Sequence, residues 1–222
     1  IQWKTTRRVN AGLETSMADN RLYLSFNYFN STTDNLLTYQ SLGYLSGLEQ
    51  NWSNGGKMRN EGFDVAANVK VLALKDWQWE VGASVGHYKN KIVSLGDGKE
   101  EIFTTVGGAT IQTKVGQPAN LFYGYRTNGV FSTTADANAA AHYILGANGI
   151  SREYFKAGDM NFLDLDQTHG NAGEINEYDR TVIGDPNPDI YGNISTSLAY
   201  KRLKLDVRFN YSLGNDVYNY MR

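Results

Sequence analysis

The sequence lacks several features that would assign a protein to a class at once. None of its 222 residues is cysteine, which excludes a disulfide framework and cysteine-ligated metals. No run approaches the ~20 consecutive apolar residues that a membrane-spanning helix needs. Its 21 lysines and arginines nearly balance 23 aspartates and glutamates, and the resulting net charge of -2 argues against a nucleic-acid partner. The length suits one large domain, and neither a soluble sheet nor a membrane β-barrel is excluded.

Signals for catalysis are also scarce. The three histidines, His87, His142 and His169, lie in separate segments, and no pair has metal-ligand spacing. The chain contains no Gly-x-Ser-x-Gly motif and no phosphate-binding loop. Carboxylates are plentiful, so a glycosidase pair stays open to inspection, but no pattern singles one out. We therefore expect a protein that is not an enzyme.

What the chain does contain is strict two-residue alternation, best seen in the segment 190–213. Residues 203–213 alternate apolar and polar without a break, and 190–200 repeat the pattern, joined by the short link Lys201-Arg202. The pattern predicts a hairpin of two-faced strands. The charges of the second strand share one parity, so we expect the apolar parity to face lipid, as in residues Leu205, Val207 and Phe209 of this strand and Leu22, Leu24 and Phe26 earlier in the chain.

Four more strands are predicted before this hairpin. They cover residues 3–17, 21–31, 57–72 and a strand beginning at Trp77. Short polar turns at 18–20 and 73–76 join the first to the second and the third to the fourth. The stretch 32–56 is predicted to be a long surface loop. Between Lys91 and Pro188 we expect only short β-like pieces, such as 122–131, and a short helix near 135–142.

Two interpretations of these strands compete. An antiparallel sheet on a soluble core is the common one, and Trp77 and Trp79 beside a short turn fit a buried core as well as a membrane aromatic girdle. The connections, however, read short, long, short, very long, short, and every long excursion leaves the same rim. That alternation is typical of outer-membrane barrels. We therefore predict an all-β fold, a transmembrane antiparallel β-barrel segment of about six strands of a larger barrel with long extracellular loops.

Several motifs carry a family resemblance when they are taken in order. Residues 60–64 (NEGFD), 116–118 (GQP) with 122–131 (FYGYRTNGVF), 158–162 (GDMNF), 179–188 (DRTVIGDPNP) and 213–219 (LGNDVYN) resemble the SusC/RagA-type TonB-dependent outer-membrane transporters of Bacteroidota. The motifs span nearly the whole chain. The resemblance implies that residues 1–222 are part of a TonB-dependent receptor β-barrel domain of roughly 22 strands, with 91–188 as a long extracellular loop region. Residues 1–4 open within a strand pattern and show no signal peptide, which indicates a stretch cut out of a longer chain. The resemblance further implies that the plug, the TonB-contacting segment and the last strands are absent from this stretch.

The same resemblance implies a function. The expected activity is TonB-energised import of glycans or other nutrient oligomers, including peptides, across the cell outer membrane. The expected partners are a SusD-like surface lipoprotein, TonB through the absent amino-terminal regions, and outer-membrane lipid. The alternative from another class is a surface-exposed β-rich binding or adhesin module that uses its long loops without transport. Solubility separates the two, because a barrel wall needs detergent.

An acidic loop departs from the family pattern. Relatives often carry a calcium-like Asp-x-Asn-Gly-Asp-Gly run, whereas here Asp164, Asp166, Glu174 and Asp179 are spread over sixteen residues. These four side chains are candidate calcium ligands, because hard cations bind several converging oxygens. The spacing is not that of an EF-hand, since the twelfth residue of a loop begun at Asp164 is Ile175. A solvated acidic loop is the other interpretation, and no other cofactor is expected.

Five aromatic residues of the predicted loops are candidates for contacts with a ligand or partner. Aromatic rings stack on sugars and anchor protein interfaces, although ordinary loop packing is also open to them. The candidates are Tyr39, Tyr44, Trp52, Tyr143 and Tyr154.

Overall fold

The computed structural model describes residues 2–41, 50–166 and 168–219, and it divides into two compact units. The first, which we call the sheet unit, comprises residues 1–103, 112–120 and 185–222. The second, the loop unit, comprises 104–111 and 121–184. Each unit is considered by itself below.

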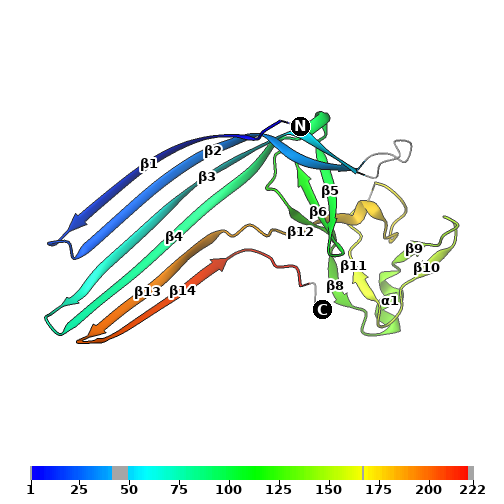
Figure 1. Cartoon of the computed structure of the whole chain (residues 1–222). Coiled ribbons are helices and arrows are strands. Elements are labelled where there is room, and N and C mark those ends of the chain that lie inside the picture. Colours follow the sequence, from blue (N-terminus) through cyan, green and yellow to red (C-terminus); the bar gives the residue numbers. More distant parts are fainter. Residues whose placement is uncertain (1, 42–49, 167, 220–222) are drawn as a thin grey trace. The chain divides into compact units, whose positions relative to one another are not determined.

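A six-stranded antiparallel sheet forms most of the sheet unit (Figure 1). Its strands, in spatial order, are β1 (Thr5–Met17), β2 (Leu22–Ser41), β3 (Gln50–Ala73), β4 (Trp77–Ser94), β13 (Ile190–Tyr200) and β14 (Leu203–Leu213). Neighbours in the chain are neighbours in the sheet except at β4 and β13, where the chain leaves the sheet and returns. The predicted six-stranded antiparallel arrangement is confirmed, and the bounds predicted for β13 and β14 coincide with the observed ones.

The register of the sheet separates the side chains into two faces. One row across the strands reads Leu13, Phe26, Val65 and Val85, and a parallel row reads Leu24, Ala67, Ala83, Ile194 and Phe209. We call this side the apolar face. The adjacent rows carry Glu14, Ser25, Ala66, Ser84, Asn193 and Asn210, or Asn68, Gly82, Ser195 and Arg208, and form the polar face. The six residues predicted to face lipid all lie on the apolar face, opposite Asp206 and Arg208.

The apolar face has the height of a membrane core. In β14 every second residue from Leu203 to Leu213 is apolar and shares this face. Ten steps of ~3.3 Å give roughly 33 Å along the strand, or about 25 Å once a barrel tilt near 40° is applied. Several of these side chains are largely exposed, Phe209 by 67% and Leu205 by 59%, so the sheet unit covers them with nothing of its own.

Tight turns join the strands at the end away from the long connections. Ala18, Asp19 and Asn20 all have left-handed backbone angles, with φ between 53° and 62°, and the Arg21 N–H donates to the Met17 carbonyl at 3.1 Å. Aspartate and asparagine tolerate this region better than most residues. Lys201 is also left-handed, and its N–H donates to the Asp76 carbonyl at 2.9 Å, which ties two neighbouring turns together.

The stretch 32–56 differs from its prediction. It was expected to be a surface loop, but β2 runs on to Ser41 and β3 begins at Gln50. The two extensions pair with each other, with register shifts between Thr33 and Leu37. Only residues 42–49 lie between the two strands. Backbone hydrogen bonds between β2 and β3 hold these extensions together. The polar residues Thr32, Asn35 and Asn54 interrupt the alternation of apolar and polar residues, so the hydropathy pattern did not indicate strands here.

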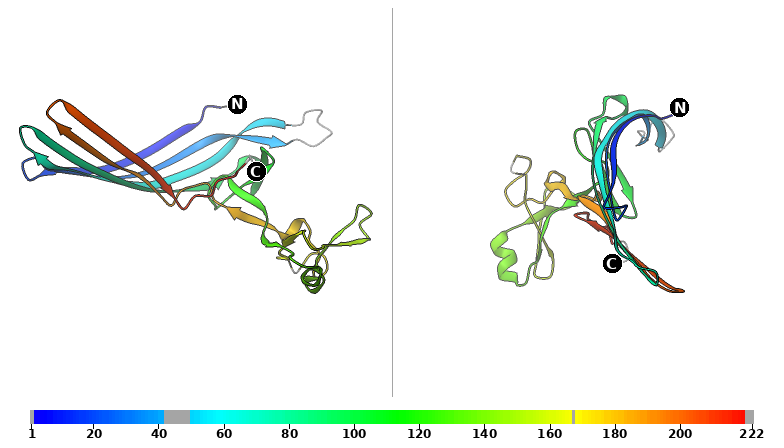
Figure 2. Two further views of the ribbon diagram at one scale, coloured as in Figure 1. Left: turned by 90° about the horizontal axis from the view of Figure 1, so that it is seen from below. Right: turned by 90° about the vertical axis from the view of Figure 1, so that its left-hand side faces the viewer.

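The region 91–188 contains the short strands that were predicted, together with the helix. Residues 91–94 still belong to β4. The further elements are η2 (Gly96–Gly98), β5 (Glu101–Val106), β6 (Ala109–Lys114), β7 (Leu121–Tyr125), β8 (Thr127–Val130), α1 (Thr134–Ala140), β9 (Tyr143–Leu145), β10 (Arg152–Tyr154), β11 (Met160–Phe162), η3 (Glu177–Asp179) and β12 (Arg180–Gly184). They form a four-stranded sheet β12-β7-β6-β5 and two two-stranded sheets (Figure 2).

A small aromatic core holds the loop unit together. Phe131 and Tyr143 are 3% and 2% exposed. The Phe155 ring lies 6.5 Å from that of Phe131 and 5.8 Å from that of Phe162. Helix α1 begins with a capping box in which Thr133 and Asp136 exchange hydrogen bonds. Among the described residues, no helix is long and apolar enough to cross a membrane.

Candidate functional site

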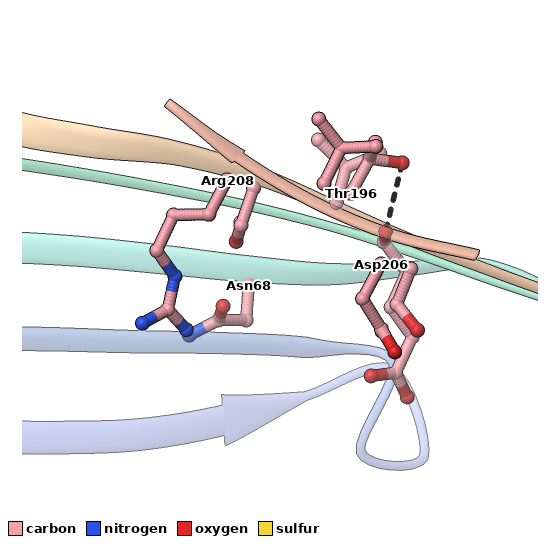
Figure 3. Close-up of a pocket in the computed structure, with 10 residues that line it drawn as sticks. Asn68, Thr196, Asp206 and Arg208 are labelled. Carbon is pink, nitrogen blue, oxygen red and sulfur yellow. Dashed lines mark hydrogen bonds between the residues drawn. The ribbon is translucent and has the colours of Figure 1, made fainter. Parts of the chain in front are cut away.

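The polar face of the sheet carries the first candidate site, a depression of about 430 Å³. Its walls and floor include Asn68, Glu80, Gly82, Ser195, Asp206 and Arg208. Figure 3 shows Asn68, Asp206 and Arg208 on one side of the strands and Thr196 on the other, as the register requires. Four strands, β3, β4, β13 and β14, therefore contribute to one polar surface.

Glycine at position 82 keeps this depression open. A Cβ atom there would collide with the Asn68 side-chain oxygen and come within 2.8 Å of the Ser195 hydroxyl. Gly86 lies two positions further along the same face, beyond Ser84, and leaves room for the Tyr191 ring to lie across it. The Tyr191 hydroxyl donates a hydrogen bond to Asp64 at 2.8 Å. Small residues here let neighbouring side chains lie flat on the sheet.

The charges in the depression are only partly compensated. Asp206 pairs with Lys204 at 3.1 Å. Arg208 and Glu80 form no ion pair among the described residues. The face therefore presents a guanidinium and a carboxylate to whatever lies on that side of the sheet, together with amide and hydroxyl groups that both donate and accept hydrogen bonds.

A second cluster lies at one rim of the sheet, where three sequence motifs meet. Asn90 of β4 accepts a hydrogen bond from the Ala119 N–H at 2.7 Å and donates one to Asn187 at 2.6 Å. Asn187 in turn donates to Asp185 at 2.7 Å. The Asp185 N–H donates to the Asp216 carboxylate at 2.8 Å. We call this set of five residues the rim junction.

The rim junction explains why these motifs occur together. The GQP segment, the GDPNP segment and the LGND segment were singled out separately in the sequence, and the structure brings their neighbourhoods to one place. Asn90, 8% exposed, was missed because an asparagine inside a strand gives no signal of its own. The alternation along β4 could have indicated it, because Asn90 has the same parity as Ser84 and therefore lies on the polar face.

In the described part of the predicted acidic loop, hydrogen-bond donors occupy most of the candidate carboxylate oxygens. Asp179 is fully buried and accepts hydrogen bonds from the N–H groups of Leu165, Asp166 and Asn176 at 2.7 to 2.9 Å. Glu174 accepts from Asn171. Backbone N–H groups thus take the oxygens that a cation would need.

Asp164 and Asp166 behave similarly. One oxygen of Asp164 accepts from the Gly173 N–H at 2.8 Å, and the other is buried without a partner. In the described part of the chain, no three acidic, histidine or cysteine side chains converge as ion ligands. Calcium takes six to eight oxygen ligands, and the described carboxylates are mostly engaged by hydrogen-bond donors, so these residues as arranged do not fit this ion.

Asp166 has the clearest electrostatic signature in this loop. The Thr168 hydroxyl, at 2.6 Å, is the largest influence on its carboxylate, and the N–H groups of Thr168 and His169 and the His169 ring add to it. Together they lower the pKa of Asp166 from 3.8 to about 2, against a smaller opposing effect of burial. The His169 ring stacks on Tyr178 with centroids 4.1 Å apart.

The five predicted contact aromatics have four different outcomes. Tyr39 and Trp52 are register partners on β2 and β3, rather than loop residues as predicted. Tyr44 lies outside the described residues. Tyr154 is 52% exposed on β10, where a partner can reach it. Tyr143 is buried at 2% and lies under the Arg152 guanidinium, 4.6 Å from its ring, so it belongs to the core of the loop unit and presents no surface for contact.

The chain resembles known proteins along its whole length. A sequence model of the family described as TonB dependent receptor-like, beta-barrel, matches residues 1–220. TonB-dependent receptor P3 of Formosa agariphila is 31% identical over 225 residues, and TonB-dependent receptor P26 of the same organism is 26% identical over 223. Each alignment covers 99% of this chain and 21% of the relative, so the chain spans about a fifth of their length.

Solved structures show the same fold. The RagAB peptide importer in its closed-closed state aligns with a TM-score of 0.71 at 22% identity, over 97% of this chain and 22% of that one. The structure of the RagAB peptide transporter aligns with a TM-score of 0.67, also at 22% identity, over 96% of this chain and 22% of that one. The sheet and the inserted loop unit therefore have counterparts in an experimentally known architecture.

Proposed function

The chain belongs to the TonB-dependent receptor β-barrel family, and from that premise we propose that it forms wall and outer loops of an outer-membrane transporter that imports nutrient oligomers. The six strands cross the cell outer membrane as part of a multi-pass barrel. The region 91–188 lies on the extracellular side. The polar face lines the lumen.

The apolar face is the single observation that carries this proposal. About 25 Å of outward-facing apolar side chains matches the hydrocarbon band of an outer-membrane barrel. Trp77 and Tyr200, whose ring centroids are 4.3 Å apart, border it at the short turns, and Tyr28 and Phe63 border it towards the long connections. A soluble protein would leave an apolar surface of this size in water, which monomeric proteins rarely do.

The proposed cargo is a glycan or a peptide. The RagAB structures are named as a peptide importer, which supports a peptide for that protein, and the polar depression here offers hydrogen-bonding groups that suit either class. The proposed partners are a SusD-like surface lipoprotein above the loops and TonB, which would act on parts of the parent protein other than this chain. The candidate residues supply binding and shape, and we assign them no catalytic step.

Uptake in cells tests the transport role. The parent gene, expressed in its native host, should support growth on a single oligomer or accumulation of a labelled one. Deletion of tonB or of the neighbouring lipoprotein gene should abolish that uptake, while uptake of a small porin substrate in the same cells continues. Uptake that persists without TonB would contradict the proposal.

A fractionation experiment separates the transporter from an adhesin-like module. The parent protein should remain in the outer-membrane fraction after carbonate washing and require detergent for extraction. A protein released by carbonate and monomeric without detergent would instead support a surface module.

A further inference from the structure

Two tyrosine rings meet on the polar face, towards the end of the sheet that bears the long connections. Tyr88 of β4 and Tyr191 of β13 both have the parity of this face. Their ring centroids lie 5.8 Å apart and the ring planes are inclined by 62°, so the rings form two walls of a corner. We call Tyr88 and Tyr191 the aromatic corner. It stands among amide, hydroxyl and charged side chains, and no packing requirement of an exposed polar face accounts for it.

Glycine leaves the space that the corner occupies. A Cβ atom at position 86 would lie 2.5 Å from the Tyr191 ring, so only glycine lets that ring cross β4 towards β3. Gly62 is the register partner of Tyr88, and a Cβ atom there would lie 2.8 Å from the Phe29 ring on its other side. Both glycines are buried, whereas the Tyr88 and Tyr191 side chains stay half-exposed above them.

One charged group of each sign adjoins the corner. The Tyr191 hydroxyl donates to one oxygen of Asp64 at 2.8 Å, and in the described part of the chain the other oxygen accepts no hydrogen bond. The Arg8 guanidinium lies over the Phe29 ring, 5.0 Å from its centroid, and its Nε donates to Asn10 at 2.8 Å. Among the described residues, neither Arg8 nor Asp64 takes part in an ion pair. This part of the face therefore carries no net charge.

We propose that the aromatic corner binds an uncharged sugar ring of an imported glycan. The inference rests on the proposed function, in which the polar face lines the lumen. A pyranose has C–H groups on its faces, which pack against aromatic rings, and hydroxyl groups around its edge. A sugar that packs on Tyr191 and against Tyr88 places hydroxyl groups beside Asp64. The second oxygen of that carboxylate accepts a hydrogen bond from one of them.

The surroundings of the corner favour an uncharged sugar over a charged chain. Arg8 and Asp64 have opposite charges, so a polyanion or a polycation would meet one repulsive group whichever its sign. An uncharged ligand that both donates and accepts hydrogen bonds uses both groups without such repulsion.

A peptide fits the same surroundings less well. Peptides commonly bind by adding a strand to an open sheet edge, but β3, β4 and β13 are each paired on both sides. In the two described register rows that carry the corner, no side chain is aliphatic, so apolar peptide side chains would find no matching pocket.

Binding to the full-length parent protein tests the proposal. The protein, purified in detergent, is titrated calorimetrically with uncharged oligosaccharides of glucose, xylose, mannose and galactose, with oligogalacturonate, and with a mixed oligopeptide digest. At least one uncharged oligosaccharide should bind. Tyr88→Leu should weaken that binding roughly tenfold, because the loss of one aromatic stacking partner is close to the free energy of a tenfold change. Tyr88→Phe keeps the ring and should bind as the unmodified protein does.

A second variant removes the polar partner and leaves both rings in place. Asp64→Ala should weaken binding of the same oligosaccharide roughly tenfold, because a hydrogen bond to a charged group is lost. It also keeps the proposal open to contradiction if Tyr88→Leu does not fold.

The matched control makes the same change on the opposite face of the sheet. Tyr28 faces the apolar side, where it is the register partner of Phe63, so Tyr28→Leu should leave oligosaccharide binding unchanged. A loss in this control as large as in Tyr88→Leu, or full binding by both Tyr88→Leu and Asp64→Ala, would overturn the proposal. Binding confined to oligogalacturonate or to peptides, or no binding of any uncharged oligosaccharide, would also overturn it.

The outcome for the transport role is read separately. If uptake by the parent protein depends on TonB but the cargo is a peptide or a charged glycan, the proposed function survives and the corner proposal fails. If the parent protein is soluble without detergent, the polar face lines no lumen and both fail.

Discussion

Phe209 and Asn210 are adjacent residues of β14 that face opposite sides of the sheet. Phe209 pairs with Ile194 on the apolar face and is 67% exposed, whereas Asn210 pairs with Asn193 on the polar face. At mid-membrane, Phe209→Arg should cost about 2–4 kcal/mol of folding free energy in a bilayer, because a charge enters the hydrocarbon. Asn210→Arg should have little effect. Denaturant titration of the parent protein in lipid vesicles measures both, and equal costs would show that the faces are assigned wrongly.

Asp166 gives a pH-dependent prediction. Its pKa is lowered to about 2, below the 3.8 of the unfolded chain, so its contribution to loop order is complete above about pH 4 and is lost as the pH falls towards 2. Pepsin, which works in this range, should begin to cut within 164–179 only below about pH 3. Asp166→Asn, which cannot accept the same set of hydrogen bonds, should be cut already at pH 4. Identical pH profiles for the two proteins would contradict the assignment.

The acidic loop shows what residue types alone could predict. Composition identified Asp164, Asp166, Glu174 and Asp179 as a group, and all four do accept hydrogen bonds. Whether carboxylates converge on an ion or separate to cap backbone N–H groups depends on the path of the chain. Gly170 and Gly173, both with positive φ, set that path, and their presence is consistent with either outcome.

At the scale of elements, the rim junction should hold two connections against β4. Asn90→Ala removes the acceptor of the Ala119 N–H and the donor to Asn187, which leaves two half-buried polar groups without these partners at a cost of about 1 kcal/mol. Hydrogen exchange should accelerate in residues 115–120 and 185–189. The control Asn210→Ala removes an exposed asparagine from the same face and should change neither segment. If hydrogen exchange in these two segments is unchanged in the Asn90 variant, then the hydrogen bonds of Asn90 do not hold the two connections against β4, which contradicts the prediction.

Strand bounds were predictable from sequence only where the two faces of the sheet lie in different environments. Lipid or core on one side and water on the other impose alternation, which is why the bounds predicted for β13 and β14 are correct. The extensions of β2 and β3 within residues 32–56 do not separate two environments. Their Thr, Asn and Gly residues therefore show no alternation from which a strand could be predicted. The three-residue strands β9, β10 and β11 are too short for any period to appear, although short strands were expected in that region as a class.

At the scale of the whole molecule, orientation is open to direct test. We predict that trypsin added to intact cells cuts the parent protein in the loop unit, where Arg152 and Lys156 are exposed, or cuts its covering lipoprotein. The turns containing Lys75 and Arg202 should be spared, because they lie on the periplasmic side. After the outer membrane is permeabilised, those turns should become cleavable. Cutting at the turns before permeabilisation would reverse the orientation.

The return of the chain from β4 to β13 has a consequence for the order of folding. Ser84 and Asn193 are hydrogen-bonded neighbours 109 positions apart, whereas β13 and β14 are joined by two residues. Closing the longer connection costs about 3 kcal/mol more in chain entropy, at ~0.6 kcal/mol for each doubling of length. High contact order slows folding, so we expect the hairpins to zip first and the β4–β13 seam to close last, once the intervening segment has folded and shortened the search. With no native cysteine in this region, engineered pairs at 84 and 193 and at 195 and 208 can time the two events by the rate at which each crosslink forms during assembly.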